Sequence, residues 1–231
     1  MAKFKKIIDV VLVVLIFAIT GSIVYINIQK QQAVDRSKIP EKVEMNKGFQ
    51  RWITNLKNKG LTIEADEFKL LEENEIYNTK WLKIYSMDQE GVTELFEQAI
   101  ASHQDIKKVI FSPSKRQFID YRSEERDGYN ANEVHYYGLR EDKVVDARIL
   151  DCSAKANCMF DRAYFLDNDV FVISEISRNI DKKAVDAPPC TPNNKCTYSF
   201  KLHVIDLNRN SRLIYESKPF ETILTGLIPD L

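Results

Sequence analysis

The sequence predicts an α+β protein with an N-terminal transmembrane helix, two short helices and a mainly antiparallel β domain. Three observations lead to this prediction. A run of 22 residues from Ile7 to Ile28 contains a single charge, at Asp9. Two later segments repeat apolar residues with the period of a helix. From Lys107 onward, short segments rich in Val, Ile, Phe and Tyr alternate with polar turns, as in antiparallel sheets.

The apolar run has the length of a membrane-spanning helix, because 22 residues at 1.5 Å each cover about 33 Å. It continues past the small residues at 18–22, which favours an uncleaved signal anchor over a cleaved signal peptide. Three lysines within the first six residues favour a cytoplasmic N-terminus, although four basic residues between positions 30 and 42 weaken this count. We therefore expect a single-pass plasma-membrane protein with an extracytoplasmic C-terminal domain.

The predicted organisation is a tail and anchor at 1–28, a stalk at 29–40, an α+β subregion at 41–106 and the β domain at 107–231. The first helix of the subregion is stopped by Gly60, and its apolar face contains Met45, Phe49, Trp52, Ile53 and Leu56. The second helix begins near Asp88 as N-cap and is expected to bury Val92, Leu95, Phe96 and Ala99. Residues 81–87 are predicted as a strand, while 61–71 fit a strand or a helix.

The β domain is predicted to contain about eight strands with short connections, which is typical of an antiparallel meander. The expected strands are 108–111, 117–122, 133–140, 143–150, 162–167, 169–177, 197–207 and 211–217. Asp and Asn occupy the turns more often than Gly. The longest irregular insertion is expected at 184–195.

The four cysteines form two pairs of equal spacing, Cys152 with Cys158 and Cys190 with Cys196. In an oxidising compartment this pattern predicts two disulfides. Three connectivities are open, and the local pairing is favoured because the residues between each pair are polar and loop-like. A four-cysteine zinc site is the alternative, but its half-sites usually have shorter spacing. A redox dithiol would need the shorter Cys-x-x-Cys spacing.

The segment VIFSPSKRQFIDYR, followed by YYGLREDKVVDARIL, resembles a blade of a TolB-type β-propeller. The segments RAYFLDNDVFVISEIS and YSFKLHVIDLNRNSRLIYES resemble a second unit, although Leu166-Asp-Asn replaces Ser-Pro-Ser there. The resemblance covers residues 107–217. It implies paired four-stranded meanders, either packed as a sandwich or completed by other copies, since two blades cannot close a propeller. No ligand residues are carried over with it.

The net charge of the chain and its motifs limit the classes of function that the sequence supports. The first 28 residues carry three Lys and one Asp, so the remainder has a net charge of −3, which gives no reason to expect nucleic-acid binding. No cofactor and no metal are predicted. The expected partners are the membrane, through one helix, and a protein or other component of the cell envelope.

Several short motifs are better explained by structure than by catalysis. Ser112-Pro-Ser-Lys115 matches Ser-x-x-Lys but is flanked by strands, so a hairpin turn is predicted. Asp206 to Asn210 resembles a calcium loop but lacks its Gly and its bidentate Glu. The histidines at 103, 135 and 203 are interpreted as strand or surface residues. The carboxylates at 124, 125 and 127 are interpreted as a solvated hairpin loop.

Three tyrosines, Tyr129, Tyr136 and Tyr137, are the candidate surface contacts for a protein or a glycan. Strand alternation places Tyr136 and Tyr137 on opposite faces, so one of them is expected to face outward. The function predicted from the sequence is a membrane-anchored, extracytoplasmic binding or scaffold module of a prokaryotic cell envelope, without enzymatic activity. The alternative is a hydrolase of cell-wall or other glycans, which requires two carboxylates, such as Asp120 and Asp146, about 5 to 9 Å apart in a cleft.

Overall fold

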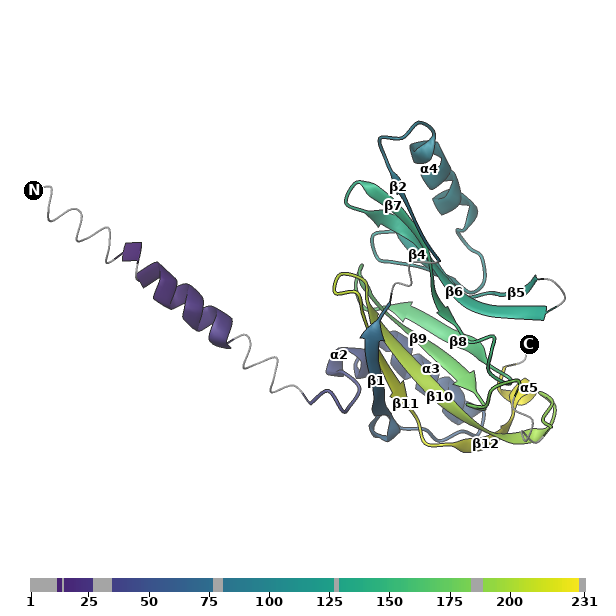
Figure 1. Ribbon diagram of the computed structural model, residues 1–231. Coiled ribbons are helices and arrows are strands. Elements are labelled where there is room, and N and C mark those ends of the chain that lie inside the picture. The colour runs from purple at the N-terminus through teal and green to yellow at the C-terminus, as the bar shows by residue number, and fades with distance from the viewer. Residues whose placement is uncertain are drawn as a thin grey trace, which may run out of the picture. The chain divides into compact units, whose positions relative to one another are not determined.

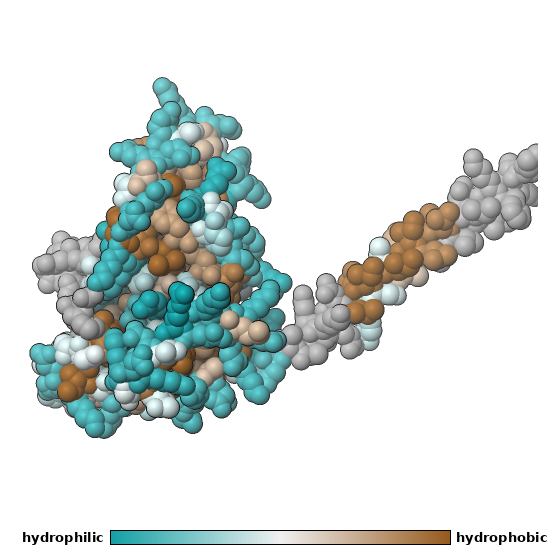
Figure 2. Space-filling view, turned by 180° about the vertical axis from the view of Figure 1, so that it is seen from behind, coloured by the Kyte–Doolittle hydropathy of each residue, from teal (hydrophilic) through white to brown (hydrophobic). Residues whose placement is uncertain are grey.

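The computed structural model describes residues 12–13, 15–26, 35–76, 81–126, 129–183 and 189–228. The chain divides into two compact units, residues 1–37 and residues 38–231 (Figure 1). In the first unit, residues 12–13 and 15–26 are helical. Their large apolar side chains are exposed, and this helical segment is mostly hydrophobic on its surface (Figure 2).

The predicted transmembrane helix is corrected by the structure. Within the described residues, no helix is both long and apolar enough to cross a membrane. Residues 7–11, 14, 27 and 28 of the predicted span lie outside the described residues. So do residues 29–34 of the predicted stalk, whereas Ile39 at its end is buried in the core of the second unit.

The second unit contains two antiparallel sheets. The first sheet has the order β1-β11-β10-β9-β8, with β12 paired to β10. Its strands are β1 (Lys69–Glu75), β8 (Met159–Phe165), β9 (Val170–Ser177), β10 (Lys195–Asp206), β11 (Ser211–Glu216) and β12 (Phe220–Ile223). The second sheet has the order β2-β7-β6-β4-β3, with β5 paired to β6. Its strands are β2 (Leu82–Ser86), β3 (Val109–Phe111), β4 (Gln117–Asp120), β5 (Ser123–Arg126), β6 (Tyr129–Arg140) and β7 (Lys143–Asp151).

The two sheets follow the same plan. Strands β3, β4, β6 and β7 form one four-stranded meander, and β8 to β11 form the other. Each meander is extended beside its last strand by one strand from the first part of the unit, β2 beside β7 and β1 beside β11. The second unit thus contains two four-stranded meanders, and they pack face to face as a sandwich. The shared core contains Tyr136, Val145 and Ile149 from one sheet and Phe171, Ile173 and Ile205 from the other.

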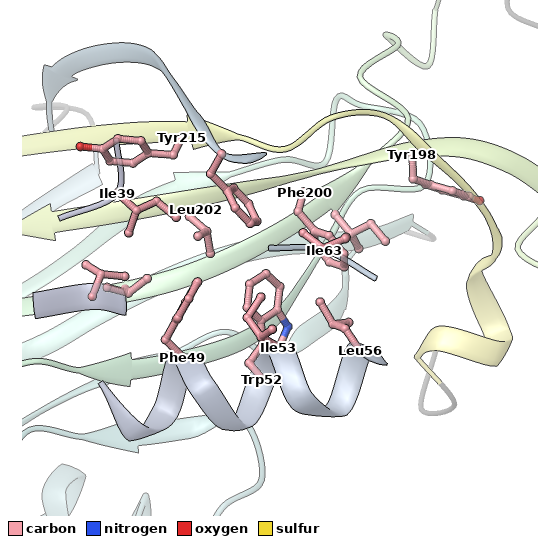
Figure 3. Close-up of a cluster of buried hydrophobic side chains, with 14 of the residues drawn as sticks. Ile39, Phe49, Trp52, Ile53, Leu56, Ile63, Tyr198, Phe200, Leu202 and Tyr215 are labelled. Atoms are coloured by element: carbon pink, nitrogen blue, oxygen red, sulfur yellow. The ribbon is translucent and has the colours of Figure 1, made fainter. Parts of the chain in front are cut away.

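A helix covers the outer face of each sheet. On the first sheet, α3 (Lys47–Asn58) buries Phe49, Trp52, Ile53 and Leu56. Figure 3 shows these side chains directed at the sheet, where the Trp52 ring meets Phe200 edge-on at 5.0 Å between centroids. On the second sheet, α4 (Val92–Ser102) buries Phe96 and Ile100. These pack against the strand residues Val109, Phe118 and Val144. The unit is therefore built from four layers, helix, sheet, sheet and helix.

Within the second unit, each predicted helix and strand has a counterpart in the structure, but element boundaries differ and further elements are present. Met45 and Leu95 are exposed, and the N-cap of α4 is Gly91 instead of Asp88. All eight strands expected after residue 107 are present, and β2 matches the strand predicted at 81–87. The elements that the prediction missed or left open are α2 (Glu41–Glu44), the 3-10 helix η1 (Ala65–Glu67), β1, β5, β12 and α5 (Leu224–Leu227).

Candidate functional site

A cleft of about 690 Å³ lies at the end of the sandwich that carries the β6–β7 turn. The inner face of the second sheet forms one side of the cleft, through β2, β7 and the start of β4. The β8–β9 and β10–β11 turns of the first sheet form the other side, through Asn168, Asp169 and Asn208. The volume lies within the range of sites that bind small ligands or short peptide segments.

The floor of the cleft is apolar because alternate residues of two neighbouring strands point to the same face. Leu82 pairs with Ala147 and Ile84 with Val145, so the side chains of Leu82, Ile84 and Val145 lie together on the inner face. Val145 is buried in the sandwich core, but Ile84 is 54% exposed. The apolar surface of the interior therefore continues outward into a solvent-accessible site.

The rim of the cleft carries three cationic side chains, Arg116, Arg140 and Lys143, and two carboxylates, Glu141 and Asp169. The Arg140 Nη1 atom lies 3.6 Å from the Asp169 Oδ1 atom, and its Nη2 atom donates to Asn208 Oδ1. Arg140 thus ties the second sheet to both turns of the first. Arg116 and Lys143 are exposed. Within the described residues neither of them forms a salt bridge, so both remain available to an anionic group.

A hydrogen-bond relay lies at the inner end of the cleft. The buried Tyr136 hydroxyl donates to Gln117 Oε1 at 2.6 Å. The Gln117 Nε2 atom donates to the carbonyl of Asn168, and the Asn168 side chain accepts from the Ser114 backbone at 2.8 Å. The relay crosses from one sheet to the other. It therefore fixes the position of the β8–β9 turn relative to the cleft floor.

Tyr136 and Tyr137, two of the three candidate tyrosines, lie on opposite faces of the second sheet. Tyr136 is fully buried between the sheets, so it is not a contact residue. Tyr137 does lie on the outer face, but its ring stacks between Phe96 and Phe118 beneath α4, with centroids at 6.0 and 5.5 Å. The backbone of Tyr129 belongs to β6, and its side chain lies outside the described residues.

Both disulfides form with the predicted local connectivity. The Cα atoms of Cys152 and Cys158 are 5.8 Å apart, and those of Cys190 and Cys196 are 6.5 Å apart. The two loops touch, because Asn157 Nδ2 donates to the Cys190 carbonyl at 3.2 Å. The cysteines therefore fasten the end of the sandwich at which β8 and β10 begin.

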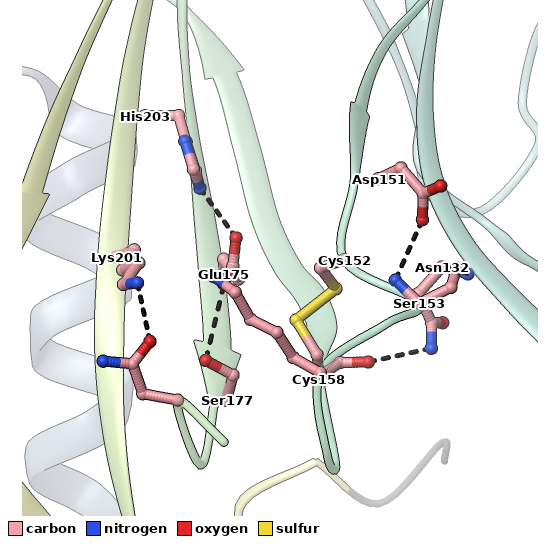
Figure 4. Close-up of a disulfide and its surroundings, with 11 residues drawn as sticks. Asn132, Asp151, Cys152, Ser153, Cys158, Glu175, Ser177, Lys201 and His203 are labelled. Carbon is pink, nitrogen blue, oxygen red and sulfur yellow. Dashed lines mark hydrogen bonds and ion pairs between the residues drawn. A yellow bond between two sulfur atoms is a disulfide. The ribbon is translucent and has the colours of Figure 1, made fainter. Parts of the chain in front are cut away.

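A buried polar network lies beside the first disulfide on the inner face of β9 and β10 (Figure 4). The Glu175 carboxylate contacts His203 Nε2 at 3.0 Å and Lys155 Nζ at 3.2 Å. Burial raises the pKa of Glu175, but hydrogen bonds from His203 and Lys155 and nearby positive charge outweigh it and lower the pKa to about 2. Burial lowers the pKa of His203, more than the contact with Glu175 raises it.

The network is internal rather than a ligand site. The side chains of His203 and Glu175 are only 4% and 5% exposed. His135 forms a similar contact, with its Nε2 atom 2.9 Å from the Glu133 carboxylate. Two of the three histidines therefore each contact a glutamate. The third, His103, stacks on Phe118 with a centroid distance of 4.6 Å.

The acidic pair of the alternative function does not converge in the structure. Asp120 and Asp146 lie on the outer face of strands separated by β6, opposite His135 and Tyr137 respectively. Strand spacing and register place their Cα atoms roughly 12 Å apart. Asp120 is held by Arg122, with an Nη2–Oδ2 distance of 2.5 Å. Neither aspartate lines the cleft.

The remaining motifs are turns or strand. Ser112 and Lys115 belong to the β3–β4 turn, in which the Lys115 N–H donates to the Ser112 carbonyl at 3.0 Å. Asp206 caps the β10–β11 turn by accepting from the backbone N–H groups of residues 208 and 209, each at 3.0 Å. Residues 124 and 125 belong to β5 instead of a loop, and residue 127 lies outside the described part. In the described part of the chain, no group of three His, Cys, Asp or Glu residues is arranged to hold a metal ion.

The comparisons with known proteins give no match. No family model, no curated protein and no solved structure matches the chain. The resemblance of residues 107–217 to TolB-type blades therefore stays a prediction, and functional inference depends on the site itself.

Proposed function

We propose that the chain is an extracytoplasmic binding module, and that its cleft receives a ligand with an apolar body and an anionic group. The observation that carries this proposal is the arrangement of an apolar floor inside a rim with two available cations. Leu82, Ile84 and Val145 offer surface to an apolar body, while Arg116 and Lys143 attract a carboxylate or a similar anion. Ligand sites commonly combine apolar walls with a few polar groups that fix orientation.

The extracytoplasmic compartment is supported by the cysteines. Both pairs form local disulfides, and the described residues include no free cysteine. Disulfides of this kind persist in oxidising compartments and are rare in reducing ones. Intact cells expressing the chain are treated with a membrane-impermeant maleimide, with and without a prior impermeant reductant. Labelling only after reduction supports the proposal, whereas labelling without a reductant, or none after reduction, contradicts it.

The ligand class is tested with two probes of the same apolar body and opposite charge, 4-phenylbutyrate and 4-phenylbutylamine. Binding to the full chain is measured by saturation-transfer NMR at low ionic strength, because such small probes bind weakly. We expect the carboxylate to bind at least about fivefold more tightly than the amine. Equal binding of both probes, or stronger binding of the amine, would contradict the proposal.

The rim is tested by the double variant Arg116→Gln/Lys143→Gln, which is expected to remove the preference for the carboxylate. The matched control Lys42→Gln/Lys69→Gln removes two exposed cations that do not line the cleft and should keep the preference. If both double variants lost the preference for the carboxylate, the preference would come from nonspecific attraction to the net charge of the protein. The floor is tested separately by Ile84→Glu, which should weaken binding of 4-phenylbutyrate.

A further inference from the structure

Strand β2 forms an edge of the second sheet beside the cleft. Its only strand neighbour among the described residues is β7. It is five residues long and exposes large apolar side chains around it, with Trp81 at 49%, Ile84 at 54% and Tyr85 at 40% exposure. An apolar edge strand is a template for pairing with another extended segment.

The hydrogen-bond pattern identifies which backbone groups of β2 are available. The Met87 N–H donates to the Asp142 carbonyl at 2.9 Å, so Met87 and Asp142 form a hydrogen-bonded pair just beyond the end of β2. Such pairs alternate along an antiparallel ladder, so Tyr85 and Lys83 bond to β7 while Leu82, Ile84 and Ser86 direct their backbone groups away from it. The Ser86 carbonyl is used by Gln89, at 3.1 Å. Among the described residues, the backbone N–H and C=O groups of Leu82 and Ile84 have no partner on this side, so they can pair with a new strand.

The same two residues line the cleft with their side chains. In an antiparallel pairing, residues that exchange hydrogen bonds lie directly opposite each other and project to the same face. A segment bound to Leu82 and Ile84 would therefore send alternate side chains over the cleft. There they would meet the apolar floor and, on the rim, Lys143 of the neighbouring strand β7.

We propose that an extended peptide bearing apolar and acidic residues adds to the sheet as an antiparallel strand beside β2. This inference rests on the proposed function, because the cleft must accept the side chains of the peptide. Strand addition supplies main-chain hydrogen bonds for affinity and side-chain sites for specificity. The charge of the rim selects a carboxylate at the residue that projects beside Lys143. A second copy paired through β2 would bury two five-residue strands, less than the roughly 800 Å² per partner of a stable interface.

The test uses a fluorescent seven-residue peptide with threonine at odd positions, glutamate at position two, which lies opposite Ser86 beside Lys143, and valine at positions four and six, which lie opposite Ile84 and Leu82. Fluorescence anisotropy measures its affinity for the full chain. Methylating the even-numbered backbone amides, which face β2 when valine and glutamate enter the cleft, should weaken binding at least about tenfold. Methylating the odd-numbered amides should change it less than threefold. Equal losses, or a larger loss from the odd positions, would overturn the proposed pairing.

A protein variant gives an independent readout. Ile84→Pro removes one outward N–H but no bond to β7, a position at which edge strands accept proline. It should reduce peptide affinity at least about tenfold, while the control Ile84→Val keeps it. Thermal unfolding checks that Ile84→Pro remains folded, and the methylated peptides decide the question if it does not.

The two proposals fail in different ways. If 4-phenylbutyrate binds with the expected charge preference but the peptide does not, or binds regardless of amide methylation, strand addition is overturned while the cleft remains a binding site. If neither probe binds, both proposals are overturned. Replacing the glutamate of the peptide by lysine should weaken binding at least about fivefold, and unchanged binding would refute selection of a carboxylate.

Discussion

Gln117 lies directly across the ladder from Gly138, and a β-carbon added at position 138 would come within 2.3 Å of the Gln117 Cβ atom. It would also come within 2.8 Å of the Tyr136 hydroxyl. Glycine therefore gives Gln117 the space in which it bridges Tyr136 to the β8–β9 turn. The lack of a side chain at Gly138 therefore allows the hydrogen bonds of Gln117 at the inner end of the cleft.

Gly138→Ala is predicted to destabilise the protein by about 1 to 3 kcal/mol, because the clash is with a strand side chain that cannot move without breaking the relay. Urea unfolding measures the change. Gly226→Ala is the matched control, since an added β-carbon there meets nothing within 4 Å, and it should leave the free energy of unfolding unchanged or slightly higher. Equal effects of both substitutions would contradict the proposed crowding at Gly138.

Tyr136→Phe is predicted to cost about 1 to 2 kcal/mol, because it leaves the buried Gln117 Oε1 atom without its hydroxyl donor. Tyr164→Phe is the control. The Tyr164 hydroxyl is buried and has no hydrogen-bond partner among the described residues, so its removal should be neutral or stabilising. Thermal unfolding of the two variants distinguishes a used hydroxyl from an unused one. A comparable loss in Tyr164→Phe would show that hydroxyl volume, and not hydrogen bonding, sets the effect.

The strands after residue 107 could be predicted because alternation of apolar and polar residues is a local signal. Strand β1 could not, since its sequence KLLEENE has no regular alternation and five of its seven residues are exposed. It becomes a strand through pairing with β11, more than 130 residues later. Leu95 was expected to be buried because it fits the apolar pattern of its helix, but α4 buries only the narrow stripe formed by Phe96 and Ile100.

The cleft could not be predicted as a site because its parts come from distant segments. Leu82 and Asn208 are 126 positions apart and meet only through the packing of the two sheets. One signal was present in the segment 81–87, where apolar side chains occur on both faces of a short strand. That pattern is unusual for a solvent-facing edge and is typical of a strand that has, or accepts, further contacts. The local disulfides, by contrast, could be favoured from the sequence, because the cysteines lie in two equally spaced pairs with polar, loop-like residues between them, provided that the compartment is oxidising.

Acid is predicted to destabilise the protein through Glu175. Its pKa is about 2 in the folded protein and 4.5 in its ordinary state, so the stabilising charge is fully present above about pH 4.5. This contribution, roughly 3 kcal/mol at most, is lost as the pH falls from 4.5 toward 2. His203 adds to the same trend at higher pH. Because its pKa is lowered on folding, the unfolded chain takes up the proton first as the pH falls below 6.5.

Glu175→Gln should reduce stability at pH 7, because it removes the carboxylate that binds Lys155, and should flatten the loss of stability below pH 4.5. Urea unfolding between pH 3 and pH 7 measures both effects. Glu221→Gln is the control, since the Glu221–Lys195 pair is more than 60% exposed on both sides and should contribute less than about 0.5 kcal/mol. Parallel pH profiles for the wild type and Glu175→Gln would show that another group controls the acid response.

The two disulfides are predicted to contribute unequally although their loops have the same length. Chain entropy gives each loop of seven residues about 2 kcal/mol. Cys152 and Cys158 are, however, buried in the core between the sheets, and their loop carries Lys155 to Glu175. Cys190 and Cys196 are only partly buried.

The double variant Cys152→Ser/Cys158→Ser should therefore lose at least about 1 kcal/mol more stability than Cys190→Ser/Cys196→Ser. It should also lose the part of the acid response that depends on the contact between Lys155 and Glu175. Equal losses, with the acid response unchanged, would show that the first disulfide acts by loop entropy alone.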